Sequence, residues 1–430
     1  MAKVFIAEQE TLLEVQKQVD KLTNNLLPLD KPIYAMVIHE ASDLNPNSRV
    51  EYLGANKNFT PMSMNMSTHA MNYGSWADWS WLKANVPVMC NFDGGIDYYL
   101  NPNDYTKKAD GTDSDVSNVD YAGDAMSVIQ KIYKKEYKVG NDRYVFFCER
   151  KVDEDFKAVG FNVLGKERDY MLIPMFYGSI DANGKMRSIA GQWSCLTASG
   201  NASDNTTGTA IGTAEQYAAI QKASKNGLFF GGALVNTLAD ICVLLSKSTN
   251  SQAAFGYGMC STYVEDKAQH YGTQINTVVG GGQFYGSSDQ KSFNKIFHSC
   301  VMGSYMLWQR DPYMLLKNGR ILVSPDYTYD ITGAAYLDTG VDLAANGYYA
   351  TTRVIEDFGA VPTDELVCSS ATGYCDHTWV NATILAVSLR CGHCDHGLVD
   401  GLFARTLSNV AADAWWTYAA SKLLPAPAAA

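Results

Sequence analysis

The chain has 430 residues, 47% of them hydrophobic and 18% charged, which is enough for two or three domains with a sizeable apolar core. Its formal net charge of −11 argues against nucleic acid or an acidic membrane surface as the main partner. The most apolar stretch, residues 227–245, contains Asn236 and Asp240, which favours a buried helix over membrane insertion. The first residues show no basic segment followed by an apolar one, so no secretory signal is expected.

An N-terminal helix is predicted over residues 1–30. Its apolar positions recur at alternating steps of three and four residues: Leu12, Val15, Val19, Leu22 and Leu26. Such spacing places one apolar seam along a helix, and Pro28 ends the pattern. The seam fits either a short coiled coil that joins several copies of the chain or an amphipathic helix docked on its own chain, and we favour the coiled coil.

Residues 31–118 are predicted to form a β-rich connecting domain. Short apolar runs at 33–38, 86–90 and 96–100 alternate with clusters of Asn, Gly, Ser and Pro, which is the pattern of short strands joined by loops. The polar stretch 104–118 contains several Asp residues but lacks the glycine and glutamate offsets of a calcium loop, so we expect a solvated turn there.

The pattern changes at about residue 119, and a larger domain is predicted over 119–430. Strands are expected over 143–148 and 170–176, and helices over 213–225 and 228–246. Strands and helices that occur in separate runs favour an α+β fold over a doubly wound parallel sheet.

Cysteine and histidine residues gather near the C-terminus. The run Cys391-Gly392-His393-Cys394 is similar to the redox site of protein disulfide isomerases, but no βαβ unit precedes it, which argues against redox catalysis. A metal site is the alternative, because potential ligands occur at spacings typical of zinc sites: Cys375, His377, Cys391, Cys394 and His396. Whether these residues lie close together in the fold decides between the two. The ten cysteines lack the even spacing of a small disulfide scaffold, and we expect them to be mostly reduced.

The segment 368–421 has an unusual composition. It contains no Lys, Glu, Gln or Met, whereas Tyr, Cys, Asp, His, Ser, Thr and Asn are frequent, and the codons of all these types can end in C. Apolar residues and glycines stand between them. We infer that a fixed frame carries residues drawn from a restricted codon alphabet, with chance drift as the alternative.

Four stretches of this segment resemble the variable region of target proteins of diversity-generating retroelements: 374–379, 389–397, 401–409 and 414–421. The chain ahead of them resembles phage and prophage tail-tip proteins. In that family, error-prone reverse transcription copies template adenines as any base, so Asn codons ending in C become codons for the alphabet just described. The resemblance implies a C-type lectin fold within 119–430, with the variable region at about 368–421.

The resemblance implies a variable ligand-binding face made of these residues: Tyr374, Cys375, Asp376, His377, Cys391, His393, Cys394, Asp395, His396, Val399, Asp400, Thr406, Ser408, Asn409, Asp413 and Thr417. It also implies a scaffold frame: Trp379, Gly392, Gly397, Gly401, Phe403, Trp415 and Trp416. We therefore expect the variable side chains, Cys391 and Cys394 included, to be exposed and the large frame residues to be buried. The calcium motifs of animal lectins are absent, so calcium-dependent sugar binding is not implied. No metal and no cofactor are expected, because a structural zinc site would require four fixed ligands on a surface that is meant to vary.

The implied function is attachment without catalysis. A protein of this kind sits at the tip of a virion tail fibre, next to other tail proteins, and binds a host-cell surface receptor, either protein or glycan. Two alternatives stay open. One is an enzyme on the same fold, of the formylglycine-generating type, which would use Cys391 and Cys394. The other is a bacterial surface protein diversified in the same way.

The N-terminal seam and the resemblance together predict a homotrimer. Light scattering on the purified chain should give about three times 47.1 kDa, because three copies of a heptad seam bury their apolar positions against one another. A single species of one chain at micromolar concentration would contradict this prediction.

Overall fold

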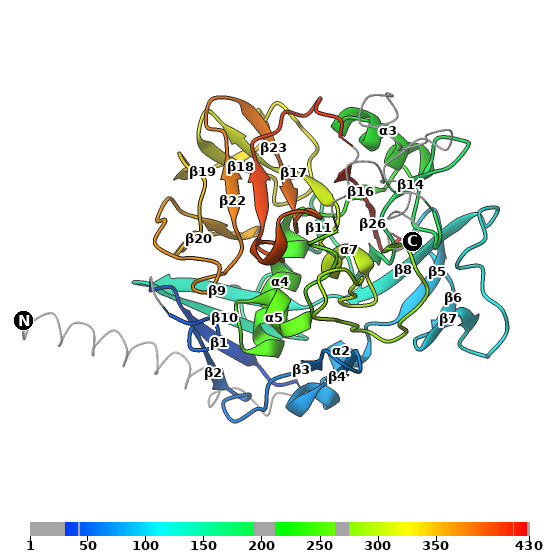
Figure 1. The fold of residues 1–430 in the computed structure, drawn as a ribbon, viewed down its shortest axis with the longest axis horizontal. Coiled ribbons are helices and arrows are strands. Elements are labelled where there is room, and N and C mark those ends of the chain that lie inside the picture. Colours follow the sequence, from blue (N-terminus) through cyan, green and yellow to red (C-terminus); the bar gives the residue numbers. More distant parts are fainter. Residues whose placement is uncertain are drawn as a thin grey trace, which may run out of the picture.

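The computed structural model describes residues 31–41, 44–192, 194, 211–262, 275–415 and 417–427. The helix predicted over residues 1–30 and the frame residue Trp416 lie outside this part of the chain. Within it, strands make up 34% of the residues and helices 13%, so the fold is mostly β, which is compatible with the expected α+β class. Figure 1 shows the larger sheets arranged around a central helix, α4 (Gly232–Ser246).

The first sheet has four antiparallel strands, in the spatial order β2 (Val50–Gly54), β1 (Tyr34–His39), β10 (Asp142–Cys148) and β9 (Tyr133–Val139). The strands expected over 33–38 and 143–148 are thereby confirmed. Successive side chains of β1 point to opposite faces, so Met36 and Ile38 lie in the main core and Val37 in a smaller one.

The second sheet has seven strands, in the order β16 (Leu228–Phe229), β26 (Lys422–Pro425), β13 (Tyr170–Pro174), β8 (Gly123–Gln130), β5 (Pro87–Asn91), β6 (Ile96–Asn101) and β7 (Asp104–Lys108). It confirms the strands expected over 86–90, 96–100 and 170–176. The stretch 104–118 begins with strand β7, so the expectation of a solvated turn throughout this stretch is wrong.

The domain boundary expected between residues 118 and 119 is also wrong. Strand β5 pairs with β8 across it, with Val88 opposite Met126, and β1 pairs with β10. Backbone hydrogen bonds and a shared core therefore join residues 31–118 to the segment that follows, and the two do not form separate domains.

The third sheet contains every described strand of the segment 368–421. Its order is β19 (Leu337–Asp342), β18 (Arg320–Val323), β17 (Trp308–Lys317), β23 (Leu385–Arg390), β24 (Arg405–Leu407) and β22 (Thr378–Val380), and β25 (Tyr418–Ala419) pairs with β17. Further strands of the described chain form two-stranded sheets: β3 (Ser63–Asn65) with β4 (Ala70–Asn72), β11 (Asn162–Val163) with β12 (Lys166–Glu167), β14 (Ser179–Ile180) with β15 (Met186–Arg187), and β20 (Thr352–Ile355) with β21 (Gly359–Pro362).

Among the described helices, only α3 and α4 are longer than five residues. The described helices besides α4 are α2 (Ser80–Lys83), α3 (Thr213–Ala223), α5 (Ser251–Phe255), α7 (Cys300–Gly303) and the 3-10 turns η1 (Gly74–Asp78) and η2 (Gly397–Val399). Helix α3 confirms the expectation over 213–225, whereas the helix expected over 228–246 begins at Gly232 because Leu228 and Phe229 pair with β26. Among the described helices, none has the length and apolar character needed to cross a membrane.

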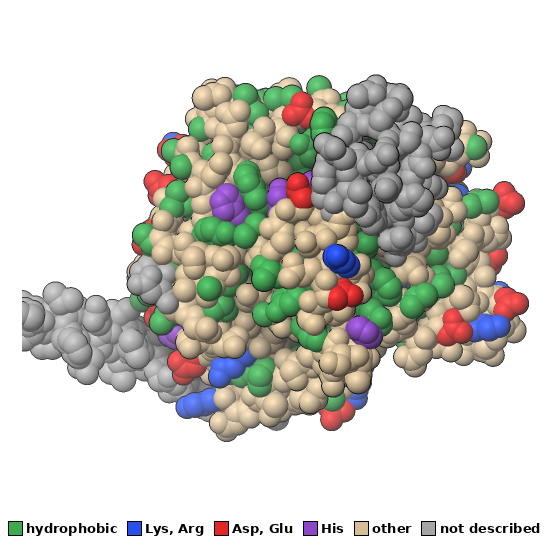
Figure 2. All heavy atoms as spheres, viewed as in Figure 1, with side chains coloured by type: hydrophobic (Ala, Val, Ile, Leu, Met, Phe, Trp, Pro, Cys, Tyr) green, Lys and Arg blue, Asp and Glu red, His purple; other side chains and the backbone are tan. Residues whose placement is uncertain are grey.

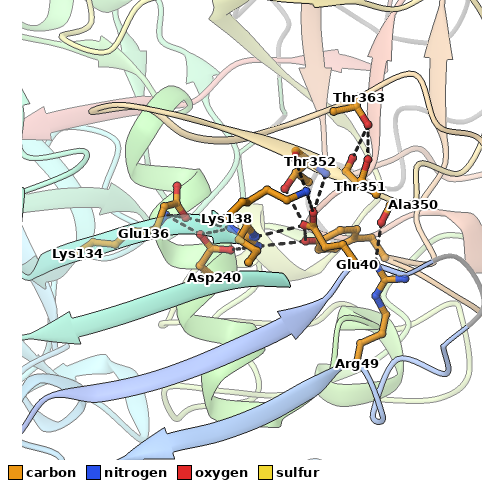
Figure 3. A network of polar contacts seen from close by, with 12 residues as sticks. Glu40, Arg49, Lys134, Glu136, Lys138, Asp240, Ala350, Thr351, Thr352 and Thr363 are labelled. Atoms are coloured by element: carbon orange, nitrogen blue, oxygen red, sulfur yellow. Dashed lines mark hydrogen bonds and ion pairs between the residues drawn. The ribbon is translucent and has the colours of Figure 1, made fainter. Parts of the chain in front are cut away.

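A network of buried charges connects α4 to the first sheet (Figure 3). Asp240 of α4 accepts hydrogen bonds from Lys134 of β9 (2.6 Å) and from Arg143 of β10 (2.8 Å). None of the three side chains is more than 3% exposed. Burial by itself would raise the pKa of Asp240, but the two cations outweigh this effect and lower the pKa. The three ions therefore hold one another in the charged state inside the core.

The substitution Asp240→Ala should cost about 3–5 kcal/mol of unfolding free energy, because it leaves two buried cations short of an anion. Asp342→Ala is the matched control. It breaks an ion pair with Arg320 in which the side chains are 37% and 63% exposed, and it should cost no more than about 1 kcal/mol. Chemical denaturation followed by circular dichroism measures both losses, and losses of equal size would contradict the prediction.

Candidate functional site

Two loops of the segment 368–421 lie side by side. The first holds Tyr374 to His377 and leads into β22, and the second joins β23 to β24 and contains η2. The His377 N–H donates to the carbonyl of Val399 (2.8 Å), and the Arg405 N–H donates to the carbonyl of His377 (3.2 Å). The parallel pairing of β22 with β24 continues this contact. Two clusters that are separate in the sequence are thus brought together at the third sheet.

Side chains from the two loops and from β22 form a surface, here called the imidazole–tryptophan face: His377, Trp379, His393, Asp395 and His396. All of them except the buried His393 are at least partly exposed. Trp379 stacks on His396 with ring centroids 4.3 Å apart, His377 lies 4.4 Å from Trp379, and His393 lies 5.0 Å from His396. In Figure 2, histidine and hydrophobic side chains gather over the region where Figure 1 draws β22. Such a surface offers stacking, hydrogen bonds and one carboxylate to a ligand.

Two aromatic residues outside the variable region complete the face. Tyr348 packs edge-on against His377 at 4.9 Å, and Trp308 lies 5.5 Å from Trp379. Trp308 is only 4% exposed and supports the face from below, whereas Tyr348 is partly exposed and adds to the contact surface. Sequence reasoning missed Tyr348, because only the tertiary bridge between Gly347 and Thr378 places it there.

Three more predicted contact residues form a polar group beside β22. The hydroxyls of Thr406 and Ser408 lie 2.7 Å apart, and the Asn409 amide donates to the Thr406 hydroxyl (3.2 Å). The Tyr418 hydroxyl donates to the Asn409 side-chain carbonyl (2.7 Å). Thr406 also pairs with Trp379 between β24 and β22, so the polar group adjoins the imidazole–tryptophan face.

Much of the predicted contact surface is buried. These predicted contact residues are at most 8% exposed: Tyr374, Cys375, Asp376, Cys391, His393, Cys394, Asp400, Thr406 and Thr417. At least partly exposed are His377, Asp395, His396, Val399, Ser408, Asn409 and Asp413. The expectation that all of them are exposed, Cys391 and Cys394 included, is therefore wrong. Both loops turn back onto the sheet, with positive φ at Cys375 (66°) and Cys391 (74°), so part of each loop faces the core.

The glycines of the predicted frame lie in constrained turns, whereas one of its large side chains is exposed. Its glycines adopt positive φ: Gly392 (126°), Gly397 (66°) and Gly401 (150°). A Cβ on Gly392 would lie 2.2 Å from the Asp400 carboxyl carbon, and a Cβ on Gly401 would lie 2.3 Å from a carboxyl oxygen of Asp376, so both positions require glycine. Trp415 is 44% exposed, which contradicts its expected place in the core, because the segment ahead of β25 runs over the surface.

Two buried carboxyl groups hold these loops. Asp376 accepts the N–H of Phe403 (2.8 Å), and Asp400 accepts the N–H of His393 (3.0 Å). In each carboxyl the second oxygen has no hydrogen-bond partner within the described chain. Burial raises the pKa of both groups well above the usual range of an aspartate. Ionisation of either group therefore costs folding free energy, and the protonated form is favoured.

Burial also sets the protonation of the thiols and imidazoles. It raises the pKa of Cys391 to about 11 and raises that of Cys394 as well, so both thiols are protonated near neutral pH. It lowers the pKa of His377 and His393, and that of His396 to about 4, so these rings are neutral near pH 7. Both thiols are free of disulfide bonds, as are those of Cys90, Cys242, Cys260, Cys300 and Cys375.

Comparison with known proteins assigns no family to the chain. No protein-family model matches it, and no curated protein matches it at a significant level. The resemblance to retroelement-diversified proteins therefore rests on the residues themselves, and the function that it implies is developed below as a proposal.

The variant Asp376→Asn should gain stability relative to the native chain as the pH rises from 5 to 8. The folded-state pKa of Asp376 lies above the unfolded value of about 3.9, so this carboxyl lowers stability as the pH rises toward its folded pKa. An amide has no such proton to lose, and its oxygen can still accept the N–H of Phe403. Urea denaturation at both pH values measures the gain.

Asp364→Asn is the control, because Asp364 is exposed. Its unfolding free energy should differ from that of the native chain by the same amount at both pH values. A gain for Asp376→Asn that does not change between pH 5 and pH 8 would show that the buried carboxyl does not retain its proton in the folded state.

Proposed function

We propose that this chain is a receptor-binding protein at the tail tip of a phage or prophage, and that it binds a host-cell surface receptor through the imidazole–tryptophan face and the adjoining polar group. One observation carries the proposal. Residues of the restricted codon alphabet form two clusters that are separate in the sequence, at 374–377 and 393–400. The structure brings the exposed residues of both clusters next to one another.

The division between buried and exposed positions supports binding by a variable surface. Asp376 and Asp400 fasten the two loops from inside, and the glycines at 392 and 401 leave room for their carboxyls. The side chains of His377, Asp395 and His396 then project from a fixed backbone. Contact residues on turns that a rigid scaffold holds can change without loss of the fold.

The proposal includes a C-type lectin fold for the part of the chain that carries the variable region. The mixed third sheet, with parallel as well as antiparallel pairs, and the helices α3 and α4 support it. A homotrimer would present three copies of the face. Because a second binding event on the same particle is then intramolecular, weak single sites would combine into tight attachment.

The enzyme alternative has less support than the binding proposal. A cysteine that performs redox or copper chemistry acts through its thiolate, whereas burial raises the pKa of both Cys391 and Cys394. The diversified bacterial surface protein uses the same face as the phage protein. The two proposals predict the same contact residues. They differ only in whether a phage particle or a bacterial surface carries the chain.

Binding to cells tests the proposal. The labelled chain, applied to a panel of bacterial strains and read by flow cytometry, should bind one or a few strains. The variants His377→Ala, Asp395→Ala and Trp379→Ala should each lower the apparent affinity for those strains at least about tenfold, because contact residues at the centre of an interface carry most of its energy.

Tyr99→Ala is the matched control, because it removes a 52% exposed aromatic side chain from the second sheet, and it should bind as the native chain does. Equal binding by the native chain and the face variants, or no binding to any strain, would contradict the proposal. The retroelement itself is tested in the neighbouring DNA, where a near-copy of the segment coding for 368–421, rich in AAC codons, should lie beside a reverse transcriptase gene.

A further inference from the structure

The imidazole–tryptophan face holds a group of metal-ligand side chains at one corner. His393, Asp395 and His396 can each offer one ligand atom, and these three atoms lie within 4.8 Å of one another. Nε2 of His396 lies 3.6 Å from the Asp395 carboxylate, and Nδ1 of His393 is in contact with the same carboxylate. Ligand atoms around a tetrahedral Zn²⁺ lie about 3.3–3.5 Å apart, so small side-chain rotations bring these groups to ligand distance.

We propose that His393, Asp395 and His396 bind a transition-metal cation of the Zn²⁺ type, with a coordination position left open toward solvent. The resemblance led us to expect no metal on this surface, and the side-chain geometry points the other way. The inference does not depend on the proposed function, because it concerns only whether these three side chains hold a cation.

A fourth residue supports the site from inside. Asp400 is fully buried, and its Oδ1 lies 3.4 Å from Nδ1 of His396. Neither of these two atoms has a hydrogen-bond partner in the described part of the chain. A ligand histidine usually donates its other ring N–H to a carboxylate, which fixes the tautomer and the orientation of the ring. In this arrangement Nδ1 of His396 lies next to the Asp400 carboxyl, whereas Nε2 lies next to Asp395, on the side of the proposed cation.

The surroundings restrict both the carboxylate and the ring. The other oxygen of Asp400 accepts the N–H of His393 (3.0 Å), so one buried residue positions the two histidine ligands together. The ring of His396 stacks on Trp379 at an interplanar angle of 25°. Gly392 leaves no side chain between the loop and Asp400. The ring of His396 and the backbone of His393 are therefore positioned before a cation arrives, which lowers the entropy cost of binding it.

The donor set selects the class of cation. Two imidazole nitrogens and one carboxylate oxygen suit Zn²⁺ and similar transition metals, whereas Mg²⁺ and Ca²⁺ prefer oxygen ligands alone. The cation reaches the site from solvent, because the side chains of Asp395 and His396 are 45% and 26% exposed. Three protein ligands leave at least one position for water or for a group of a bound partner.

Metal titration of the full chain tests the inference. After treatment with a chelator and its removal, isothermal titration with Zn²⁺ should give one tight site per chain, and excess Mg²⁺ should not compete. Asp395→Ala and His396→Ala should each weaken Zn²⁺ binding at least about tenfold. His69→Ala, which removes a partly exposed histidine distant in the sequence, should leave affinity and stoichiometry unchanged. Circular dichroism of each variant controls for folding.

Co²⁺ serves as a spectroscopic probe of the ligands and of Asp400. The native chain should show the visible absorption of tetrahedral or five-coordinate Co²⁺ with nitrogen and oxygen ligands. Asp400→Asn should shift this spectrum and weaken Co²⁺ binding about 10–100-fold. If Asp400 only stabilised the fold, the variant would bind fewer Co²⁺ ions per folded chain and the spectrum of the bound ion would not change.

Three results would overturn the inference. The first is the absence of a stoichiometric Zn²⁺ site, which would make the contact of His393 with Asp395 a simple hydrogen bond. The second is unchanged binding in the ligand variants. The third is an intense near-ultraviolet sulfur-to-cobalt band, which would place the metal on cysteine instead.

Discussion

The buried charges around Arg143 are the interaction on which the rest of the structure depends. Arg143 contacts Asp240 of α4 on one side and the hydroxyl of Tyr374 on the other (3.2 Å). Tyr374 in turn donates to Glu40, which also accepts the N–H of Thr352 (2.8 Å). One layer of paired charges thus ties the first sheet to the central helix, to the β20–β21 hairpin and to the variable region. Arg143 and Lys134 each contact more than one carboxylate, so removal of Asp240 would leave two buried cations with fewer counter-ions.

This arrangement limits what a diversified region can change. Tyr374 is drawn from the restricted codon alphabet, yet its hydroxyl belongs to the buried charge layer. Asp400 likewise fixes the backbone of His393 from inside. His377, Asp395 and Asn409 have no comparable task in the core. If the segment is diversified, only those variants fold whose inward-facing residues can still form the same hydrogen bonds.

The same side chains support two different readings of the surface. As a binding face, His377, Trp379 and His396 offer neutral rings that stack and donate or accept hydrogen bonds. As a metal corner, His393, Asp395 and His396 offer ligand atoms that lie within 4.8 Å of one another. The two readings are compatible, since a cation with an open position adds one more way in which a partner can be held. They are separable by experiment, because Zn²⁺ titration of the purified chain measures metal binding and cell binding measures attachment.

Local pattern in the sequence determined where chain segments become strands or helices. Apolar runs of strand length predicted β1, β5, β6, β10 and β13. These predictions were possible because a buried strand needs only a few neighbouring apolar residues. The clusters of the candidate site and its glycine frame could be found for the same reason, since composition and spacing are local properties.

Only the tertiary structure decided which segments meet and which side chains face inward. The pairing of β5 with β8 removed the expected boundary at residue 118, because the hydrogen bonds between two strands leave no mark in either strand alone. Cys391 and Cys394 became buried and Trp415 exposed through the path of their loops over the third sheet. Tyr348 joined the site through a contact in space, which no spacing along the chain encodes.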